Sequence, residues 1–458
     1  MNSGIDTYYF LGIGGIGMSA LARYFASKGF RVLGYDRTSS SLTQALEAEG
    51  IDIQYDDSID KVKQLDIATT IVVRTPAVPE DMAVYVWLRE QGFRILKRAE
   101  VLGIVTRSER ALCVAGTHGK TTTSTMLAHI LYESHLGTNA FLGGIANNYS
   151  TNLLLDSHSD LVVVEADEFD RSFHHLTPYM SIITSMDPDH LDIYGTEAAY
   201  QESFEKYASL VQQALVIKKG LPIDTSRLTA KPYTYAVNEE ADFYADNIRI
   251  ADGEIRFDFH ALDAVIKDIQ LGVPVWVNIE NGVAAMAIAW LMGATDEELR
   301  YGMRTFSGVY RRFNMHINTP SVAYIDDYAH HPMELKASIE SVRKLYPDRY
   351  VIGVFQPHLF SRTKDFAADF AKVLSELDEV ALLPIYPARE KPIEGITSEW
   401  LLEQVTTKRA LVLPTILAKY LRERIKNRVA KGNNCVVITM GAGDIDRQVS
   451  GITTALQI

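Results

Sequence analysis

The hexapeptide Gly116-Thr-His-Gly-Lys-Thr121 has the residue types and spacing of a phosphate-binding loop. Gly116 and Gly119 permit a tight turn in which backbone N–H groups face an anion, and Lys120 supplies a cation for the β- and γ-phosphates of a nucleotide. The Thr121 hydroxyl is a suitable ligand for Mg²⁺. Only two residues separate the two glycines, fewer than in the common form of this loop. The alternative interpretation is an ordinary turn between a strand and a helix, with an exposed lysine.

A second glycine-rich pattern, Gly12-Ile-Gly-Gly-Ile-Gly17, lies near the N-terminus. It follows the apolar run 8–11, and Asp36 comes 36 − 17 = 19 residues beyond its last glycine. This order predicts a βαβ unit whose helix N-terminus holds a phosphate and whose acid binds a ribose-like hydroxyl. Thr75 follows another apolar run at the same predicted sheet edge and is a further candidate for ligand contact. The pattern supports binding of a nucleotide diphosphate without singling out NAD. A turn that binds nothing is the alternative.

Acidic and histidine residues follow two apolar runs in the middle of the chain. Glu165 follows the run 161–164, and His190 comes after the run 181–184. Because ligands bind beyond the carboxyl ends of parallel strands, we expect Lys120, Glu165 and His190 at one edge of a sheet. Carboxylate, hydroxyl and phosphate oxygens suit Mg²⁺, whereas a histidine ligand is less usual for this ion. Acids that cap solvated helices are the alternative interpretation.

Strand-like and helix-like segments alternate through most of the chain, which predicts an α/β fold with mostly parallel sheets. Because the chain is too long for a single core, we expect three domains, at residues 1–107, 108–312 and 313–458. Residues 245–277 are an exception, since two alternating runs flank Asp252-Gly253, a pair typical of a tight hairpin turn. There we expect a small antiparallel patch lying over the central sheet.

The bulk composition is ordinary for a globular protein, with 47% hydrophobic and 22% charged residues. The net charge of −13 argues against nucleic-acid binding. Cys113 and Cys435 lie in apolar runs and are expected to be reduced, as in the cytoplasm. The N-terminus lacks the layout of a secretory signal, and no apolar run reaches the length of a membrane span. These features predict a cytoplasmic enzyme without membrane insertion.

Seven motifs, in their order and spacing along essentially the whole chain, resemble those of the ATP-dependent Mur ligases of peptidoglycan synthesis. The motifs are Gly12-Ile-Gly-Gly-Ile-Gly17, Gly116-Thr-His-Gly-Lys-Thr-Thr-Thr123, Glu165-Ala-Asp-Glu168, Asp189-His-Leu-Asp192, Arg311-Arg-Phe313, Asp326-Asp-Tyr-Ala-His-His-Pro332 and Gln356-Pro-His358. In that family a Rossmann-like first domain holds a UDP-sugar. The second domain resembles a phosphate-loop ATPase with a mostly parallel sheet and holds ATP and Mg²⁺. A Rossmann-like third domain holds the incoming amino acid.

The most similar branch of the family joins L-alanine to the carboxylate of UDP-N-acetylmuramate through an acyl phosphate. The resemblance therefore implies an ATP-dependent amide ligase that requires ATP and Mg²⁺ and takes UDP-N-acetylmuramate and L-alanine as substrates. It also implies a role in peptidoglycan precursor synthesis, and a monomer or homodimer.

The resemblance carries over to site residues by position. It makes Lys120 and Arg312 phosphate ligands in catalysis, with His190 serving a second magnesium ion. The residues implied in ATP binding are Gly116, Thr117, His118, Gly119, Lys120, Thr121, Thr122, Asn278 and Asp327. Those implied in UDP-sugar binding are Gly12, Gly14, Gly15, Gly17, Asp36 and Thr75. Those implied in amino-acid binding are Tyr328, His330 and Arg362. Those implied as magnesium ligands are Thr121, Glu165 and His190.

Two positions depart from the family pattern. Leu359 stands where the family often has arginine after Gln-Pro-His, so Arg362 would carry more of the contact to the amino-acid carboxylate. Val277 stands where a histidine usually precedes Asn278.

Three alternatives remain open at this point. A related ligase recycles a tripeptide onto the same UDP-sugar and differs in the third domain. An NAD-dependent oxidoreductase would use the first glycine pattern and Asp36, but it would leave the second pattern and the Glu165 cluster without a role. A nucleotide-binding regulatory protein would not need a second metal ligand.

Overall fold

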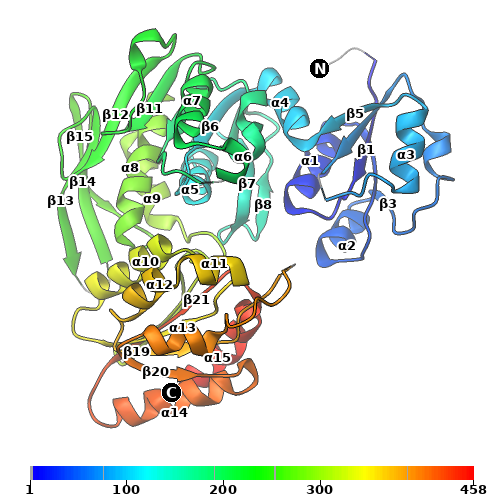
Figure 1. The fold of residues 1–458 in the computed structure, drawn as a ribbon. Helices are drawn as coiled ribbons and strands as arrows, with labels where there is room; N and C mark the ends of the chain where they lie inside the picture. Colours follow the sequence, from blue (N-terminus) through cyan, green and yellow to red (C-terminus); the bar gives the residue numbers. More distant parts are fainter. Residues whose placement is uncertain (1–3, 76, 190, 252–253, 389, 458) are drawn as a thin grey trace. The chain divides into compact units, whose positions relative to one another are not determined.

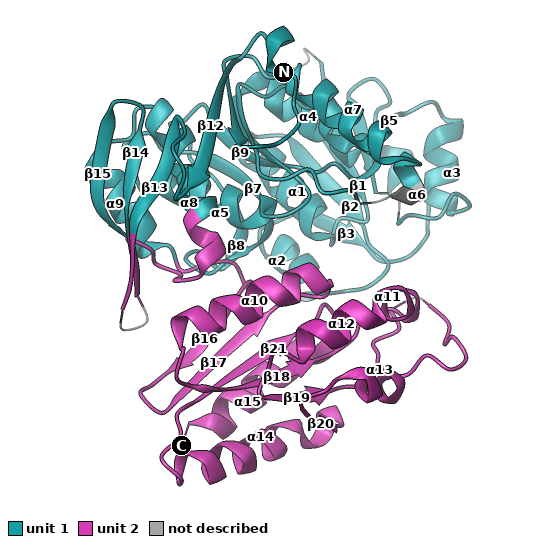
Figure 2. Ribbon diagram, turned by 60° about the vertical axis from the view of Figure 1, so that its left-hand side comes forward, with its two compact units in different colours: residues 1–247, 257–269, 280–306 teal, residues 248–256, 270–279, 307–458 magenta. Residues whose placement is uncertain are grey.

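The computed structural model describes residues 4–75, 77–189, 191–251, 254–388 and 390–457. Helices and strands alternate along the chain, and the strands form three separate sheets (Figure 1). The predicted α/β class is therefore confirmed. The chain divides into two compact units (Figure 2). The first unit comprises residues 1–247, 257–269 and 280–306, and the second comprises residues 248–256, 270–279 and 307–458.

The first sheet belongs to the first unit and has five parallel strands. In spatial order they are β3 (Asp52–Gln54), β2 (Arg31–Tyr35), β1 (Thr7–Leu11), β4 (Thr70–Arg74) and β5 (Arg94–Lys97). Its helices are α1 (Ile16–Ser27), α2 (Ser41–Ala48), α3 (Ala83–Glu90) and α4 (Arg98–Ser108). Strand β1 is buried on both faces, because Tyr8 and Phe10 belong to one apolar cluster and Tyr9 and Leu11 to another. The strand order reverses at β1, so a ligand is expected beyond the carboxyl ends of β1 and β4.

The central sheet has ten strands. In spatial order they are β15 (Ala264–Gln270), β14 (Glu254–Ala261), β13 (Phe243–Ala251), β12 (Lys231–Val237), β11 (Ala214–Lys218), β10 (Met180–Ile183), β6 (Arg110–Ala115), β9 (Leu161–Ala166), β7 (Asn139–Ala146) and β8 (Thr151–Leu154). Its helices are α5 (Lys120–Tyr132), α6 (Leu191–Tyr194), α7 (Glu197–Ala208), α8 (Trp276–Leu291) and α9 (Asp296–Thr305). Strand β6 pairs in parallel with β10 on one side and β9 on the other. The three strand ends that the sequence predicted together are therefore neighbours.

The predicted antiparallel patch has the expected strand direction, but its expected position was wrong. Strand β12 pairs in parallel with β13, so β13, β14 and β15 continue the central sheet at its edge instead of lying over it. Strands β13 and β14 run in opposite directions, since the Leu262 amide donates to the Asp242 carbonyl while His260 bonds to Asp246. The open backbone groups of β12 explain the placement, because a neighbouring strand satisfies them. The predicted turn at Asp252-Gly253 lies outside the described residues.

The third sheet belongs to the second unit. In spatial order its strands are β16 (Asn314–Asn318), β17 (Val322–Asp327), β21 (Cys435–Met440), β18 (Tyr350–Phe355), β19 (Glu379–Leu382) and β20 (Lys408–Leu411). Its helices are α10 (Pro332–Leu345), α11 (Phe360–Asp365), α12 (Ala367–Leu374), α13 (Ser398–Gln404), α14 (Pro414–Val429) and α15 (Val449–Leu456). Strand β16 is antiparallel to β17, and the other pairs are parallel.

Short 3₁₀ helices complete the secondary structure. They are η1 (Val62–Gln64), η2 (Phe169–His175), η3 (Thr225–Arg227) and η4 (Asp444–Gln448). Both cysteines are buried and unpaired. Within the described part of the chain, no helix combines the length and the apolar character needed to cross a bilayer.

Candidate active site

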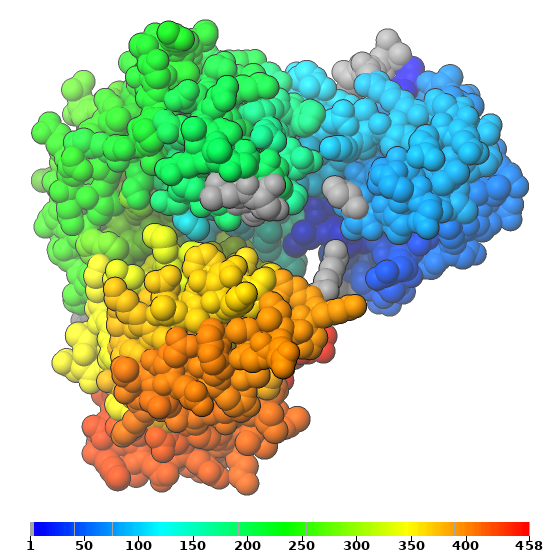
Figure 3. All heavy atoms as spheres, viewed as in Figure 1, coloured from blue at the N-terminus to red at the C-terminus, as the bar shows by residue number. Residues whose placement is uncertain are grey.

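The second glycine turn (residues 116–121) connects β6 to α5 in the way that the sequence predicts. Gly116 has φ +136°, and a Cβ there would lie only 2.1 Å from Thr184 Oγ1. Gly119 has φ +83° and serves as the residue before helix α5. Residues other than glycine rarely adopt either backbone conformation. The turn therefore requires both glycines, and its helix begins at Lys120. The space-filling view colours the chain by residue number, so atoms near the N-terminus are blue and those of the following segment pass from cyan to green (Figure 3).

The ammonium group of Lys120 is held against the turn. Nζ donates to the carbonyls of Gly116, at 2.6 Å, and of Thr117, at 3.3 Å. It also lies 2.9 and 2.7 Å from the two carboxylate oxygens of Glu168. Burial raises the pKa of Glu168, and the Lys120 charge opposes that rise. Glu168 ends the motif Glu165-Ala-Asp-Glu168, but the sequence analysis assigned it no role, because its contact with Lys120 forms only in the folded chain.

Thr121 and Glu165, two of the predicted magnesium ligands, lie together. Strand pairing places Glu165 opposite Val114, near the carboxyl end of β6. Thr121 Oγ1 donates to Glu165 Oε1 at 3.1 Å. Gly143 leaves room for this carboxylate, since a Cβ there would lie 2.0 Å from Glu165 Oε2. Two adjacent oxygen donors suit Mg²⁺, which usually takes one or two protein ligands and completes its shell with phosphate oxygens and water.

The third predicted magnesium ligand, His190, lies outside the described residues. Among the described residues, no group of three or more His, Cys, Asp or Glu side chains is placed to hold a metal ion. Thr121 and Glu165, the two predicted ligands that the structure describes, therefore fit an ion that is bound mainly through a nucleotide phosphate.

The end of β10 and helix α8 support the second glycine turn. The Ser185 hydroxyl accepts from the His118 amide at 2.8 Å, and the Thr117 hydroxyl donates to the Asp187 carbonyl at 2.7 Å. Asn281 of α8 accepts from Thr123 Oγ1 at 3.1 Å. A Cβ on Gly119 would lie 3.0 Å from the same Asn281 oxygen. Asn281 is thus a second residue that the sequence analysis missed.

Thr122 and Asn278, two further residues predicted to bind ATP, belong to helices α5 and α8. Thr122 is in the first turn of α5 and is half-buried. Asn278 belongs to the second unit, lies in the first turn of α8, and donates to the Val273 carbonyl at 3.3 Å. The structure thus leaves the roles of both residues as predictions.

The first glycine turn (residues 12–17) connects β1 to α1. Gly12 has φ +83°, and a Cβ there would lie 2.7 Å from Thr75 Cγ2, so Thr75 is directly beside the turn. The Gly14 amide donates to Asp36 Oδ2 at 2.8 Å, and the Thr38 amide donates to Asp36 Oδ1 at 3.2 Å. The predicted residues from the ends of β1, β2 and β4 therefore meet at one edge of the first sheet.

The remaining glycines of the first turn lie at the start of α1. Gly15 is the residue before α1, and its amide donates to the Gly12 carbonyl at 3.2 Å. A Cβ on Gly17 would lie 3.0 Å from a guanidinium nitrogen of Arg98, the first residue of α4. Arg98 is also 4.0 Å from Asp167, which follows β9. The Arg98 guanidinium is therefore a cation that lies close to this turn.

The predicted amino-acid ligands lie in the second unit, after β17 and β18. The Tyr328 and His330 rings are 5.3 Å apart between centroids. His330 Nδ1 lies 3.0 Å from the Tyr328 carbonyl, which can only accept, so this nitrogen carries the proton. Burial lowers the pKa of His330, Glu334 opposes this, and the Arg362 charge lowers it further. The guanidinium carbon of Arg312 lies 5.1 Å from the centroid of the Tyr328 ring.

Asp327, predicted to contact the ribose side of ATP, is buried within the second unit. Its carboxylate accepts from the Ser338 hydroxyl and, at 3.3 Å, from the Phe313 amide. Burial raises the pKa of Asp327 to about 6, and the Ser338 bond and the Arg312 charge work against that rise. These contacts fix the carboxylate beside Phe313, one residue from Arg312.

His358 is a further group that the sequence analysis left out of the pocket, although it quoted the motif that contains this residue. The His358 ring lies 6.1 Å from that of His330 and 5.8 Å from that of Tyr386. Its Nδ1 is buried and has no hydrogen-bond partner among the described residues. Burial lowers the pKa of His358 to about 4, with His330 and Arg362 adding to the effect. The next residue, Leu359, has φ +70° and is the residue before α11.

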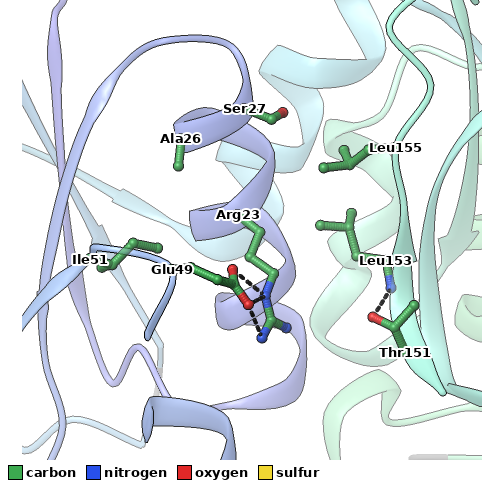
Figure 4. A pocket seen from close by; sticks show the side chains of 8 residues that line it. All are labelled: Arg23, Ala26, Ser27, Glu49, Ile51, Thr151, Leu153 and Leu155. Atoms are coloured by element: carbon green, nitrogen blue, oxygen red, sulfur yellow. Dashed lines mark hydrogen bonds and ion pairs between the residues drawn. The ribbon is translucent and has the colours of Figure 1, made fainter. Parts of the chain in front are cut away.

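An open cavity of about 420 Å³ lies elsewhere in the first unit (Figure 4). Arg23 and Glu49 form an ion pair at 2.8 Å on one side, and Leu153 and Leu155 stand opposite. None of the eight residues that line it belongs to the predicted binding groups.

Models of known families match most of the chain. A "Mur ligase family, catalytic domain" matches residues 7–110, a "Mur ligase middle domain" residues 114–289, and a "Mur ligase, glutamate ligase domain" residues 311–443. The three matches follow the order of the three sheets.

Individual proteins are similar over nearly the whole length. The UDP-N-acetylmuramate–L-alanine ligase of Parabacteroides distasonis is 56% identical over 458 residues, covering 99% of this chain and 97% of that protein. The protein of the same name from Phocaeicola vulgatus is 54% identical over 453 residues, covering 98% and 97%.

Solved structures share the architecture. That of UDP-N-acetylmuramate-alanine ligase from Thermotoga maritima matches with a TM-score of 0.78 and 27% identity, covering 98% of this chain and 99% of that one. A murein peptide ligase from Psychrobacter arcticus matches with a TM-score of 0.65 and 21% identity, covering 99% of each chain. At that identity the second match shows the fold alone.

Proposed function

The chain belongs to the Mur ligase family, and we propose that it joins L-alanine to the lactyl carboxylate of UDP-N-acetylmuramate as ATP is converted to ADP and phosphate. The observation that carries this proposal is the meeting of Lys120, Thr121 and Glu165 at the ends of neighbouring parallel strands. A cation and two oxygen ligands beside a glycine turn form a site for phosphoryl transfer, in which catalysis depends on positioning and charge neutralisation. The similarity to L-alanine ligases over the whole chain supports the choice of substrates.

Each part of the ATP site has a proposed task. The backbone amides of the second glycine turn bind the phosphates, and Lys120 neutralises charge on the β- and γ-phosphates. Thr121 and Glu165, with His190, would hold Mg²⁺, which lowers the charge of the triphosphate. The family resemblance implies that Arg312 would contact the γ-phosphate, since a guanidinium fork matches phosphate oxygens.

The first glycine turn holds the diphosphate of the UDP-sugar, and Asp36 and Thr75 complete that site. The lactyl carboxylate then attacks the γ-phosphorus, forming an acyl phosphate and releasing ADP. The amine of L-alanine attacks the acyl carbon, a proton leaves the nitrogen, and inorganic phosphate departs. One carboxylate oxygen leaves with that phosphate. No side chain forms a covalent bond in this sequence, so the protein supplies orientation and electrostatic stabilisation.

The cluster in the second unit suits an amino-acid zwitterion. Arg362 provides a cation for the carboxylate, and the neutral rings of His330 and His358 provide nitrogen acceptors for the ammonium group. Leu359 cannot supply the second cation that the family often has, so we assign the carboxylate contact to Arg362. A cytoplasmic location, a monomer or homodimer, and no nucleic-acid partner complete the proposal.

The test is phosphate release from ATP with UDP-N-acetylmuramate, in separate reactions with L-alanine, glycine, L-serine, or the tripeptide of the recycling branch. We expect release that depends on L-alanine. Release only with the tripeptide would assign the chain to the recycling ligases instead. Release with none of the four substrates would contradict the proposal. Membership of the Mur ligase family argues against the alternative of an NAD-dependent oxidoreductase. That alternative predicts a change in the absorbance of the reduced cofactor during the reaction.

A further inference from the structure

The Lys120–Glu168 pair stands out among the ion pairs of the first unit because both partners are largely buried. The Glu168 side chain is 2% exposed and that of Lys120 is 13% exposed. Both carboxylate oxygens lie within 2.9 Å of Nζ. A buried charge is costly unless it is paired, so this geometry fixes the two groups to each other.

Glu168 is the less mobile partner. Its carbonyl accepts from the Tyr194 hydroxyl at 2.5 Å and from the Arg171 amide at 2.9 Å. Asp170 and Arg171, which follow it in η2, have φ +51° and +54°, in the left-handed region that few residues adopt. The guanidinium of Arg171 also lies 4.7 Å from the Tyr194 ring centroid. The backbone that follows Glu168 is thus held in an unfavourable conformation, and Glu168 itself is anchored through its carbonyl.

Lys120 is the mobile partner by chemistry. Its four-carbon stem carries large rotamer freedom, and a compact ammonium group can donate in several directions. In this structure its donors go to the two turn carbonyls and to Glu168. The two carboxylates of the segment therefore have separate tasks, since Glu165 bonds to Thr121 and Glu168 bonds to Lys120.

We propose that Glu168 is a positioning residue for catalysis, which orients the Lys120 ammonium group toward the phosphates of ATP. This inference rests on the proposed function, because its readouts depend on ATP. Glu168 acts through Lys120 and does not itself touch the reacting atoms. With the turn carbonyls it restricts the ammonium group to one location before ATP arrives, so less freedom is lost when the phosphates bind.

The main variant is Glu168→Gln, which keeps the size of the side chain and one acceptor but removes the charge. We expect kcat to fall about 100-fold, the loss that follows when a catalytic group is displaced by about 1 Å. The Kd for UDP-N-acetylmuramate should stay unchanged. Glu168→Asp keeps the charge on a shorter stem and should restore part of the lost kcat.

Glu379→Gln provides a matched control. Glu379 is also 2% exposed and forms a two-point ion pair, with Arg424, in the second unit. Removing its charge should lower the melting temperature as Glu168→Gln does, but should leave kcat and the KM for ATP within twofold of wild type. Equal losses of kcat in both variants, at matched melting temperatures, would show that Glu168 acts only on stability.

A double-mutant cycle with Lys120→Ala gives the most specific readout. If Glu168 acts through Lys120, then Glu168→Gln should cause no further loss of kcat once Lys120 is absent. An equal loss in the wild-type and Lys120→Ala backgrounds would overturn the proposal, and so would a Glu168→Gln enzyme with kcat within twofold of wild type. An inactive wild-type enzyme would instead contradict the proposed function, before any variant is compared.

Discussion

Gly12 and Gly116 hold the same place in two successive sheets, directly after a buried parallel strand and before a helix. Both have positive φ angles and both are pressed against a residue from a neighbouring strand end. The polar groups that contact the two turns differ. At the first turn Asp36 accepts from the Gly14 amide, and at the second turn Lys120 donates to the Gly116 carbonyl.

This difference teaches how one local plan serves two tasks. A glycine turn and a helix N-terminus suffice to bind a phosphate, since backbone amides provide the donors. Phosphoryl transfer needs more, because charge that moves between oxygens must be neutralised by a cation and a metal ion. The second turn carries the Lys120 ammonium, and the next residue, Thr121, bonds to Glu165, so two oxygen ligands lie together there. We therefore assign binding to the first turn and chemistry to the second.

The largest expected effect comes from Lys120→Ala, which removes the cation from the second turn. We expect kcat to fall at least about 1000-fold, as for loss of a major electrostatic group in phosphoryl transfer. The Kd for UDP-N-acetylmuramate, measured by calorimetry, should remain within about twofold. Near-normal turnover would show that the chemistry is not at this turn. Loss of UDP-sugar binding would contradict the assignment of that binding to the first turn.

A pair of alanine substitutions tests the turns against each other. Gly116→Ala would force a Cβ against Thr184, and Gly12→Ala would force one against Thr75. We expect ATP affinity to fall about 10- to 100-fold in the first variant and UDP-sugar affinity to fall similarly in the second, because such backbone strain costs about 1–3 kcal/mol.

The control for this pair is Gly29→Ala. Gly29 has φ +86°, but no atom lies within 4 Å of the Cβ position. It should lose some stability and keep both affinities. If Gly12→Ala and Gly116→Ala each weakened both ligands alike, the two turns would not be separate sites.

A smaller effect is expected from Asp36→Asn, which removes the charge beside the first turn and keeps an acceptor for the Gly14 amide. UDP-sugar affinity should fall about 10-fold, since hydrogen bonds to charged groups contribute about 1.5–3 kcal/mol. The KM for ATP should not change. A change in the KM for ATP alone would show that Asp36 acts at the ATP site and that its assignment to the UDP-sugar site is wrong.

The smallest effect on activity concerns the helix that follows the second turn. His129 of α5 is 2% exposed and bonds to the hydroxyls of Tyr149 and Thr305, and burial lowers its pKa to about 4. Because the folded-state pKa lies below the unfolded value of about 6.5, this contribution to stability is full above pH 6.5 and is lost as the pH falls toward 4.

His129→Gln should therefore flatten the fall in melting temperature between pH 6.5 and 4.5 and leave kcat at pH 8 nearly unchanged. Identical pH profiles for the variant and the wild type would show that the pKa of His129 does not differ between the folded and unfolded states. Helix α1, after the first turn, contains no histidine and should contribute no such dependence.

The sequence predicted the parts of this site that depend on local rules. Spacing alone located both glycine turns, and the pairing of β10, β6 and β9 brought their ends together because parallel strands share a carboxyl edge. Glu168 could not be found in this way. It belongs to one of the quoted motifs, but its contact with Lys120 joins residues that are 48 apart in the sequence and forms only in the fold.

Long-range packing explains the other differences. Asn281 reaches the second turn from helix α8, 158 residues beyond its partner Thr123. The antiparallel strands β13 to β15 were expected over the central sheet, but the free edge of β12 recruits them into it. Pairing of an edge strand is decided by the whole sheet, so the sequence of a hairpin predicts its direction and not its place.

The central claim is that ATP bound at the second turn activates the lactyl carboxylate of a UDP-sugar whose diphosphate is bound at the first turn. It is tested most directly with UDP-N-acetylmuramate carrying ¹⁸O in both oxygens of its lactyl carboxylate, incubated with ATP and L-alanine. The released phosphate is then analysed by mass spectrometry. The acyl-phosphate route predicts one ¹⁸O atom in each phosphate, because a carboxylate oxygen leaves with it. Phosphate without ¹⁸O, accompanied by normal amide formation, would contradict the account.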